Sequence, residues 1–440
     1  MAPANLELSG AAERRFDDYL DAIAGALGHA DRRAPVRAYC TGLLLPGERK
    51  SVEPMAARLA PQRVPAAHQS LHHLVAKAAW RDGAVLDVVR ERVLPAIERH
   101  GPIGYWIIDD TGFPKKGRHS VGVARQYCGQ LGKRDNCQVA VTLAVANDHA
   151  SLPIGYRLYL PEAWAGDPAR RAKAGVPEEV AFRTKPQIAL AQIRRAVEQG
   201  VPGGVVLADA GYGSDTDFRT GLTERDLCYV VGVQASTSLW PPGMGPLPPK
   251  AWSGRGRPPS RVRRSPEHKP VAAEELAKGL PAAAWHTVTW REGSRRAALA
   301  SRFAAVRVRP AHRDDQLPAP HPEEWLLIEW PEGEKEPTKY WLSTLSAETG
   351  FKELVATAKA RWRIERDFQE LKQEIGLGHY EGRSWRGFHH HASLCIAAYG
   401  FLAAERCRFP PGGRFNRDRL PVPALPAGFR PRGGRGAGAA

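Results

Sequence analysis

Two adjacent acids, Asp109 and Asp110, follow an apolar run in the segment Y-W-I-I-D-D-T-G-F-P-K-K-G at residues 105–117. A buried carboxylate without a partner is costly, so a strand that ends in two acids predicts a nearby cation. In one interpretation, one acid caps the following turn and the other pairs with Lys115 or Lys116. In the other, the cation is a metal ion, and further ligands come from elsewhere in the chain.

A second apolar run also ends in an acid followed by small residues. In V-V-L-A-D-A-G-Y-G, the acid is Asp209. The glycines at positions 211 and 213 would let a phosphate backbone approach closely, because they carry no side chain. This segment is therefore a second candidate for phosphate chemistry.

A third acid, Glu365, lies in the segment A-K-A-R-W-R-I-E-R-D-F-Q-E-L-K-Q-E. On a helical period, Arg361, Glu365 and Lys372 share one face at offsets of four and seven. The alternative is a solvated charged helix that is stabilised by ion pairs between successive turns. In either case the expected core face carries four apolar residues: Trp362, Ile364, Phe368 and Leu371.

Three carboxylates from two strand ends and one helix suit a pair of hard divalent cations, Mg²⁺ or Mn²⁺, which prefer oxygen ligands. Two such ions about 4 Å apart activate a water or a 3′-hydroxyl and stabilise the leaving oxygen of a phosphoryl displacement. We therefore predict Asp110, Asp209 and Glu365 as catalytic metal ligands. Basic side chains would hold DNA phosphates near them; the candidates are Arg361, Lys372, Lys115 and Lys116.

The elements that must position these acids begin after residue 100. Three β-rich segments come first: Y-W-I-I-D-D, N-C-Q-V-A-V-T-L-A-V-A-N-D and P-I-G-Y-R-L-Y-L-P. A helix that ends at Gly200, the strand that ends at Asp209, a second helix and the strand C-Y-V-V-G-V follow. This is the order of a ribonuclease-H-like α/β core, in which the first and fourth strands are neighbours. Asp110 and Asp209 would then project from adjacent strand ends into one crevice.

The fold class that this order predicts is an α/β ribonuclease-H-like catalytic core with a β-rich insertion and an N-terminal helical domain. Two short helices near residues 51–80 are typical of a helix-turn-helix that reads DNA, or of an ordinary helical pair that packs on the core. The predicted domains are a helical, DNA-binding domain at 1–100, the first part of the core at 101–235, the insertion with a basic loop at 236–345, core helices at 346–408 and a disordered tail at 409–440.

The chain has 63 Lys and Arg against 47 Asp and Glu, a formal charge of +16. Such an excess favours a polyanionic partner. The longest apolar stretch, residues 392–404, is too short to span a membrane and is better interpreted as a core helix. The first residues lack the pattern of a secretory signal, and the six cysteines form no C-x-x-C pair. We therefore expect a cytoplasmic protein at the bacterial nucleoid, without a membrane partner.

Two weaker motifs also invite a functional interpretation. G-R-G-R-P at residues 254–258 is similar to the core of an AT-hook, or is a generic basic linker that contacts phosphates. The run His389, His390 and His391 suggests a metal site. However, consecutive helical residues point about 100° apart, so we expect a structural or DNA-facing role for this run.

Long motifs resemble those of a known family. D-D-T-G-F-P-K-K-G, A-D-A-G-Y-G and R-W-R-I-E-R-D-F-Q-E-L-K-Q-E resemble bacterial insertion-sequence transposases of the DDE class. The resemblance is strongest to the insertion sequence 701 family, which is related to the insertion sequence 4 group. It covers about residues 35–405.

The resemblance implies a catalytic triad of Asp110, Asp209 and Glu365. Asp109 is not part of this triad, and we expect it to support a metal ligand without touching the ion, or to have a structural role. A tyrosine of the wider group's helical signature is replaced here by Ala358. The resemblance also implies that an aromatic residue of the insertion can stack on an extruded base. The candidates are Trp240, Trp252, Trp285, Trp290, Trp325, Trp330 and Trp341.

The function that follows is a DNA transposase that binds its element's terminal inverted repeats, hydrolyses a phosphodiester at each end and joins the freed 3′-hydroxyls to target DNA. A homodimer on double-stranded DNA is the expected working form. One alternative is a nuclease of the same fold that cuts without joining. The other is a DNA-binding protein derived from a transposon that has lost catalysis.

Overall fold

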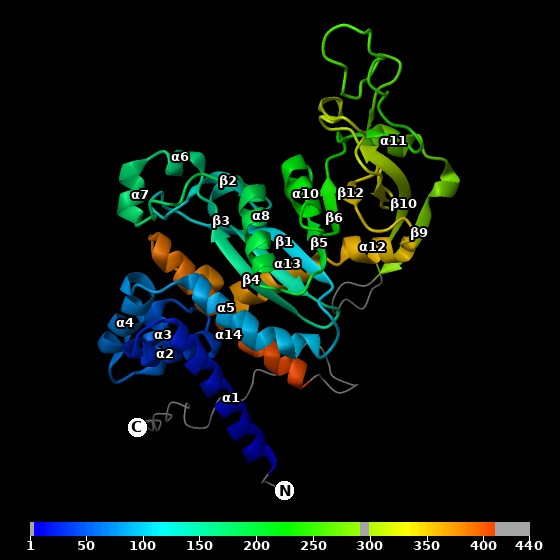
Figure 1. Cartoon of the computed structure of the whole chain (residues 1–440). Coiled ribbons are helices and arrows are strands. Elements are labelled where there is room, and N and C mark those ends of the chain that lie inside the picture. Colours follow the sequence, from blue (N-terminus) through cyan, green and yellow to red (C-terminus); the bar gives the residue numbers. More distant parts are fainter. Residues whose placement is uncertain (1–3, 291–298, 410–440) are drawn as a thin grey trace. The chain divides into compact units, whose positions relative to one another are not determined.

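The structure is a computed structural model that describes residues 4–290 and 299–409 (Figure 1). The predicted tail at 409–440 lies outside the described residues apart from Phe409. The chain forms two compact units. The first comprises Met1–Ile103, Asp110–Arg183 and Ile364–Ala440, and the second comprises Gly104–Asp109 and Thr184–Arg363.

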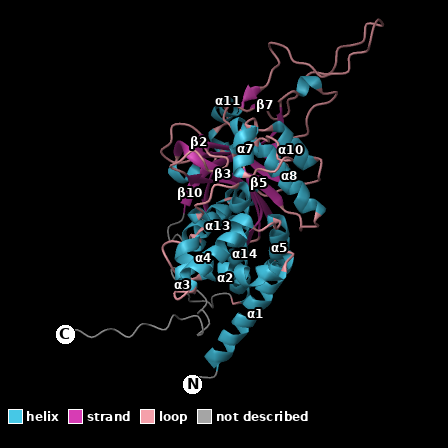
Figure 2. Ribbon diagram, turned by 90° about the vertical axis from the view of Figure 1, so that its left-hand side faces the viewer, coloured by secondary structure: helices cyan, strands magenta, loops and turns pink. Residues whose placement is uncertain are grey.

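The first unit has a helical core in which segments from both ends of the chain pack together. Its helices are α1 (Ala4–Ala26), α2 (Arg33–Leu44), α3 (Val52–Leu59), α4 (Val64–His72), α5 (Asp82–Glu98), α6 (Glu162–Ala165), α7 (Pro168–Ala174) and α14 (Trp385–Arg408), with a π-helical turn at His73–Lys77. Figure 2 shows α2, α3, α4 and α14 side by side.

Helix α14 is the centre of this core, because nearly all of its residues are buried and it contacts α5, α2 and β4 (Ser151–Leu158). The prediction of a core helix at residues 392–404 is therefore confirmed. No helix in the described part of the chain is long and apolar enough to cross a membrane.

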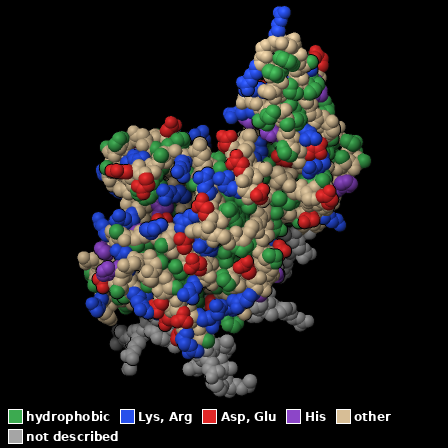
Figure 3. All heavy atoms as spheres, in the orientation of Figure 1, with side chains coloured by type: hydrophobic (Ala, Val, Ile, Leu, Met, Phe, Trp, Pro, Cys, Tyr) green, Lys and Arg blue, Asp and Glu red, His purple; other side chains and the backbone are tan. Residues whose placement is uncertain are grey.

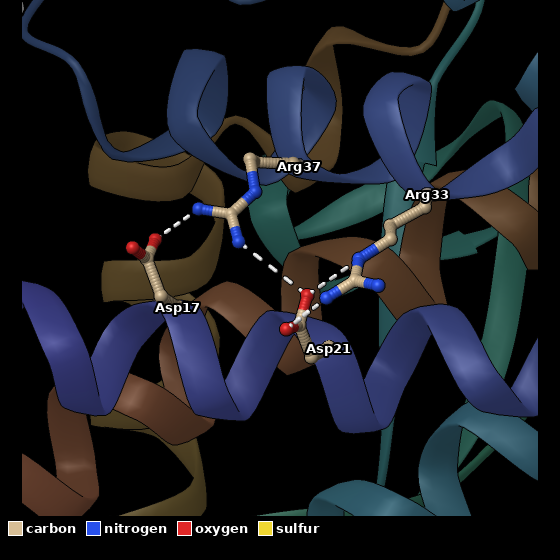
Figure 4. Close-up of polar contacts among 4 residues, drawn as sticks. All are labelled: Asp17, Asp21, Arg33 and Arg37. Atoms are coloured by element: carbon tan, nitrogen blue, oxygen red, sulfur yellow. Dashed lines mark hydrogen bonds and ion pairs between the residues drawn. The ribbon is translucent and has the colours of Figure 1, made fainter.

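Ion pairs between α1 and α2 supplement the apolar contacts at the surface (Figure 4). Arg33 Nε donates to Asp21 Oδ1 at 2.9 Å, and Arg37 reaches both Asp21 and Asp17. The Arg33 guanidinium lowers the pKa of Asp21. These side chains are largely exposed, so we expect them to orient the helices more than to stabilise them.

The three consecutive histidines of α14 are buried and each has a different set of partners. His389 Nδ1 bonds to the Trp385 carbonyl oxygen at 2.9 Å, and its Nε2 accepts the Leu158 N–H at 3.2 Å. His391 Nε2 bonds to the Gly376 oxygen at 3.1 Å, and its Nδ1 pairs with the Tyr39 hydroxyl at 2.8 Å.

His390 lies between the carbonyl oxygens of Val75 and Trp80, at 3.0 and 2.9 Å from its ring nitrogens, and stacks on the Trp80 ring. Since the three rings reach separate partners, they do not form a metal site. The structural role expected for this run is confirmed.

These histidines predict a dependence of stability on pH. Burial lowers the pKa of His389 and of His391 to about 4, whereas a histidine in an unfolded chain titrates near 6.5. Between these values the unfolded chain binds protons that the folded chain does not, so stability is complete above about pH 6.5 and falls as the pH is lowered. We expect each histidine to account for a loss of roughly 1–2 kcal/mol between about pH 7 and pH 5.

Denaturant unfolding at several pH values measures this effect. His391→Gln should flatten the dependence of the unfolding free energy on pH, whereas the same change at the exposed His73 should leave it unaltered. Equal slopes for wild type and His391→Gln would contradict the assignment.

The strands of the first unit are β2 (Ala124–Cys128), β3 (Lys133–Ala146), β4 and the second half of β1 (Tyr105–Pro114), in the order β2-β3-β1 with β4 on β3. β3 pairs antiparallel with both β2 and β4. One prediction is wrong here, and one strand was missed. β1 does not end at the two acids but continues to Pro114, and Thr111, Gly112 and Phe113 are also buried. The sequence pattern did not single out β2.

The second unit contains a mixed sheet in the order β1-β5-β6-β12-β11-β10-β7-β8, with β9 paired to β10. Its strands besides β1 are β5 (Val205–Ala208), β6 (Tyr229–Val233), β7 (Ser238–Trp240), β8 (Val271–Ala272), β9 (His286–Trp290), β10 (Leu299–Pro310), β11 (Glu324–Trp330) and β12 (Lys339–Ser343). The helices are α8 (Lys185–Glu198), α9 (Ala210–Gly213), α10 (Thr216–Thr223), α11 (Ala273–Lys278) and α12 (Phe351–Lys359), and α13 (Trp362–Glu370) begins at its end.

The parallel pairing of β1 with β5 and of β5 with β6 places the predicted first and fourth strands next to each other, as expected. The strands of the insertion do not form a separate sheet, because β12 pairs antiparallel with β6. The fold is thus mixed α/β with a large mixed sheet, in agreement with the predicted class at this level.

Candidate active site

Asp110 lies in β1, directly after Asp109, and both are half-buried. Successive residues of a strand point to opposite faces. The two adjacent carboxylates therefore face different surroundings and can take different roles.

Asp109 forms an ion pair with Arg361, whose guanidinium nitrogen lies 2.8 Å from Asp109 Oδ2 within the second unit. Both side chains are largely shielded, with exposed fractions of 17% and 27%. The two adjacent acids led us to expect a nearby cation. For Asp109 this cation is Arg361, and not Lys115 or Lys116. Arg361 was expected to hold a DNA phosphate, but in this structure it neutralises a protein carboxylate.

Asp209 follows β5 and caps α9, where its Oδ1 accepts the Gly211 N–H at 2.9 Å. The β1–β5 pairing ends with Ile107 opposite Leu207, so Asp209 and Asp109 each lie two residues beyond the same pair. The sequence predicted that Asp110 and Asp209 project from adjacent strand ends into one crevice. The adjacency of the two strands is confirmed, but the register sets Asp209 level with Asp109 instead of Asp110.

Gly213 does not have the role that the sequence suggested. A Cβ at this position would lie 2.1 Å from the Gly232 oxygen and 2.7 Å from Val231 Cβ, both in β6. The glycine is required because α9 packs directly on β6, not because a phosphate must approach it. Gly211 is exposed, so a phosphate can still approach the backbone at this position.

Glu365 is exposed and lies in the first turn of α13. Ile364, Phe368 and Leu371 are buried, as predicted, whereas Trp362 is only half-buried. The core face of this segment is therefore largely confirmed.

The single regular helix expected around Glu365 is not observed. Arg361 lies in a turn between α12 and α13, and Lys372 lies in a π-helical turn at Leu371–Ile375, so the offsets of four and seven do not mark one helical face. Ala358, at the family's tyrosine position, is buried in α12.

Lys372 and Lys115 are bound to the protein in the first unit. Lys372 Nζ donates to the Gly112 oxygen at 2.8 Å and lies over the Phe113 ring, and Lys115 Nζ donates to the Tyr380 oxygen at 3.0 Å. Burial lowers the pKa of Lys115. Lys116 is exposed, which leaves it the most accessible of the predicted phosphate-binding lysines.

The sequence interpretation missed Asp367, a buried acid near Glu365. Its Oδ1 accepts hydrogen bonds from the Ser151 hydroxyl at 2.6 Å and the Tyr399 hydroxyl at 2.8 Å, and burial raises its pKa to about 6. Its position in the sequence could have revealed that it is buried, because Asp367 lies three residues after Ile364 and four before Leu371, on the apolar face of the segment.

The predicted triad has members in both units: Asp110 and Glu365 belong to the first and Asp209 to the second. Within either unit, over the described residues, no three His, Cys, Asp or Glu side chains gather as a metal site. The donor set itself fits the predicted ions, because carboxylate oxygens are the ligands that Mg²⁺ and Mn²⁺ prefer.

The basic loop of the insertion carries one of the tryptophans proposed to stack on DNA. Trp252 is 56% exposed, whereas Trp240 and Trp341 are buried. Arg255 and Arg257 of G-R-G-R-P are exposed nearby in the chain. Among the seven candidates, Trp252 is thus the one with the most accessible ring.

Comparison with known proteins identifies the family. The sequence pattern of the family described as DDE superfamily endonuclease matches residues 22–297, which include Asp110 and Asp209. The chain is also 35% identical over 169 residues to a probable transposase for insertion sequence element IS701 of Microchaete diplosiphon. That alignment covers 38% of this chain and 41% of the relative. Because the family's sequence pattern matches more than half of the chain, the chain belongs to the DDE superfamily of endonucleases.

Proposed function

We propose that the protein is a DNA transposase of an insertion sequence. It would bind the element's terminal inverted repeats, hydrolyse a phosphodiester at each end and transfer the 3′-hydroxyls to target DNA, as a homodimer on DNA. The observation that carries the proposal is the family match, which contains two of the three predicted carboxylates. The similarity to a probable insertion-sequence transposase supports strand transfer in addition to cleavage.

Asp110, Asp209 and Glu365 are proposed as the residues that hold two divalent ions, Mg²⁺ or Mn²⁺. When bound, such ions supply Lewis-acid activation of the attacking oxygen and charge stabilisation of the leaving oxygen. The chain's own part is to orient the carboxylates. The Gly211 N–H fixes one oxygen of Asp209, and the start of α13 presents Glu365 at the surface.

Asp109 and Arg361 are proposed to position the neighbouring Asp110. Because Arg361 neutralises Asp109, the strand can carry two consecutive carboxylates without two uncompensated charges. Lys116, which is exposed, is the lysine that we assign to phosphate binding near the site.

A strand-transfer assay distinguishes this function from its alternatives. The substrate is precleaved, labelled DNA that carries the inverted repeats flanking the gene, with a supercoiled plasmid as target. A transposase joins the labelled 3′-end to the plasmid when Mg²⁺ is present. Cleavage of uncut ends without joining would establish a nuclease instead, and binding without either reaction would establish a DNA-binding protein that has lost catalysis.

A further inference from the structure

A basic cavity of about 560 Å³ lies within the first unit, and its lining includes none of the proposed carboxylates. Its walls come from α2, α3 and the chain before it, α4, the π-helical turn after α4, the loop after β1, α6, α7, and α14 and the chain before it. Lysine and arginine outnumber acids in the lining, where the acids are Glu53 and Glu381. The basic residues are Lys50, Lys77, Arg118, Arg170, Lys173 and Arg383.

Hydrogen bonds and ring contacts hold the rim of this cavity in place. The Val121 N–H donates to the Arg383 oxygen at 3.0 Å, which joins the loop after β1 to the chain before α14. The Arg170 guanidinium lies 3.8 Å from the ring centre of Trp164, and the Trp164 Nε1 donates to the Val123 oxygen at 2.8 Å. The segments that carry Arg170 and Arg383 are therefore held in place by contacts with the chain after β1.

Four of the basic side chains, Lys77, Arg118, Lys173 and Arg383, are exposed on the rim. In residues 4–290 and 299–409, no carboxylate forms a salt bridge with any of them, and Glu381 is already paired with Arg49. Lys and Arg side chains lie along the surface between α7 and α4 in Figure 3.

Lys50 differs from these four. It is buried, and its ammonium donates to the carbonyl oxygens of Leu43 and Glu374, so it serves the packing of the cavity floor. Burial lowers its pKa to about 8. The excess charge that a ligand would meet therefore comes from the rim.

An unneutralised set of cations around a concave surface attracts a polyanion. The phosphates of DNA are regularly spaced along a strand, so a rim that spreads its cations over several elements matches a backbone better than a single small anion. Arginine and lysine side chains position a duplex by such contacts without reading its sequence.

We propose that this cavity and its rim bind the sugar–phosphate backbone of double-stranded DNA, as an anchoring contact in addition to the carboxylate site. The proposal rests on the proposed function, since it assumes DNA as the substrate. It assigns Lys77, Arg118, Lys173 and Arg383 to phosphate contacts.

Binding of a short fluorescein-labelled DNA duplex of arbitrary sequence, measured by fluorescence anisotropy with EDTA over a series of salt concentrations, tests the proposal. The full chain would be compared with the double variant Lys173→Ala, Arg383→Ala. Log affinity falls with log salt, and each lost phosphate contact makes this slope shallower by about 0.9. For the double variant we expect a slope that is shallower by about 2 units. We also expect the affinity to fall roughly 10- to 100-fold at about 0.1 M salt.

The matched control is Arg14→Ala, Arg92→Ala, which removes the same charge from exposed positions of the same unit that do not line the cavity. An equal loss of slope in both double variants would overturn the proposal, because net charge alone would then explain it. So would an unchanged slope in the cavity variant, or a loss of affinity for duplex RNA without a loss for DNA.

This test is separate from that of the proposed function. Binding is measured without divalent metal, so it does not depend on catalysis. If the wild type cleaves and joins DNA but the cavity variant binds with an unchanged slope, only the anchoring contact fails. If the wild type neither cleaves nor joins DNA, but the cavity variant binds DNA more weakly than the wild type does, the proposed function fails and the anchoring contact stands.

Discussion

Asp209→Asn is expected to reduce the rate of Mg²⁺-dependent DNA cleavage by about a thousandfold or more, with DNA binding in EDTA unchanged. The substitution keeps the shape of the side chain but replaces a charged oxygen ligand by a neutral amide, which holds a hard divalent ion far less well. The side-chain oxygen of asparagine can still accept the Gly211 N–H, so the cap of α9 is retained. The loss would therefore be one of chemistry and not of folding.

Asp215→Asn is the matched control for this variant. Asp215 is also half-buried in the second unit, and its Oδ1 caps α10 by accepting the Phe218 N–H at 2.9 Å. We expect the Asp215→Asn protein to cleave DNA at a rate within about threefold of the wild-type rate, since this carboxylate has no catalytic role in the proposal. Cleavage by Asp209→Asn at more than a tenth of the wild-type rate would refute the assignment of Asp209 as a metal ligand.

Gly213→Ala is expected to lower the free energy of unfolding of the second unit by about 3 kcal/mol. The added Cβ would meet the backbone oxygen of Gly232, which cannot move aside without breaking the pairing of β6. Helix α9 would have to shift away from the sheet. Urea unfolding followed by tryptophan fluorescence measures the change as a lower midpoint.

Gly203→Ala serves as the control, because a Cβ there meets no atom within 4 Å. It should leave the midpoint within the error of the measurement. If Gly213→Ala unfolds at the same urea concentration as Gly203→Ala, close packing on β6 does not explain the glycine. Weaker DNA binding by a stable Gly213→Ala protein would instead support the approach of a phosphate.

Local sequence patterns predicted several elements correctly. The strand of residues 205–208 is continuously apolar, and α8 begins at a Thr184–Gln187 capping box and is followed by Gly200 in a left-handed conformation. Such features depend on neighbouring residues, so they can be recognised from the sequence without tertiary contacts. The pairing of β1 with β5 followed from the order of strands and helices, since few sheets satisfy that order.

Local patterns failed where a distant residue determined the outcome. The periodicity of residues 358–374 predicted one helix, but the chain turns at Arg361, where the guanidinium pairs with Asp109, 252 positions away. Gly213 resembled a phosphate-binding glycine because the residues that require a glycine there, Val231 and Gly232 of β6, lie in a different segment of the chain.

The sequence by itself determined the family, the three candidate carboxylates and the adjacency of the strands that carry two of them, because these depend on residue type and on element order. Only the tertiary structure decided which cations neutralise protein acids and which remain exposed. Arg361 and Lys372 bind protein atoms, while Lys173 and Arg383 stay accessible on the rim of a cavity. The physical reason is that the partner of a charge is set by proximity in space, which a one-dimensional pattern does not contain.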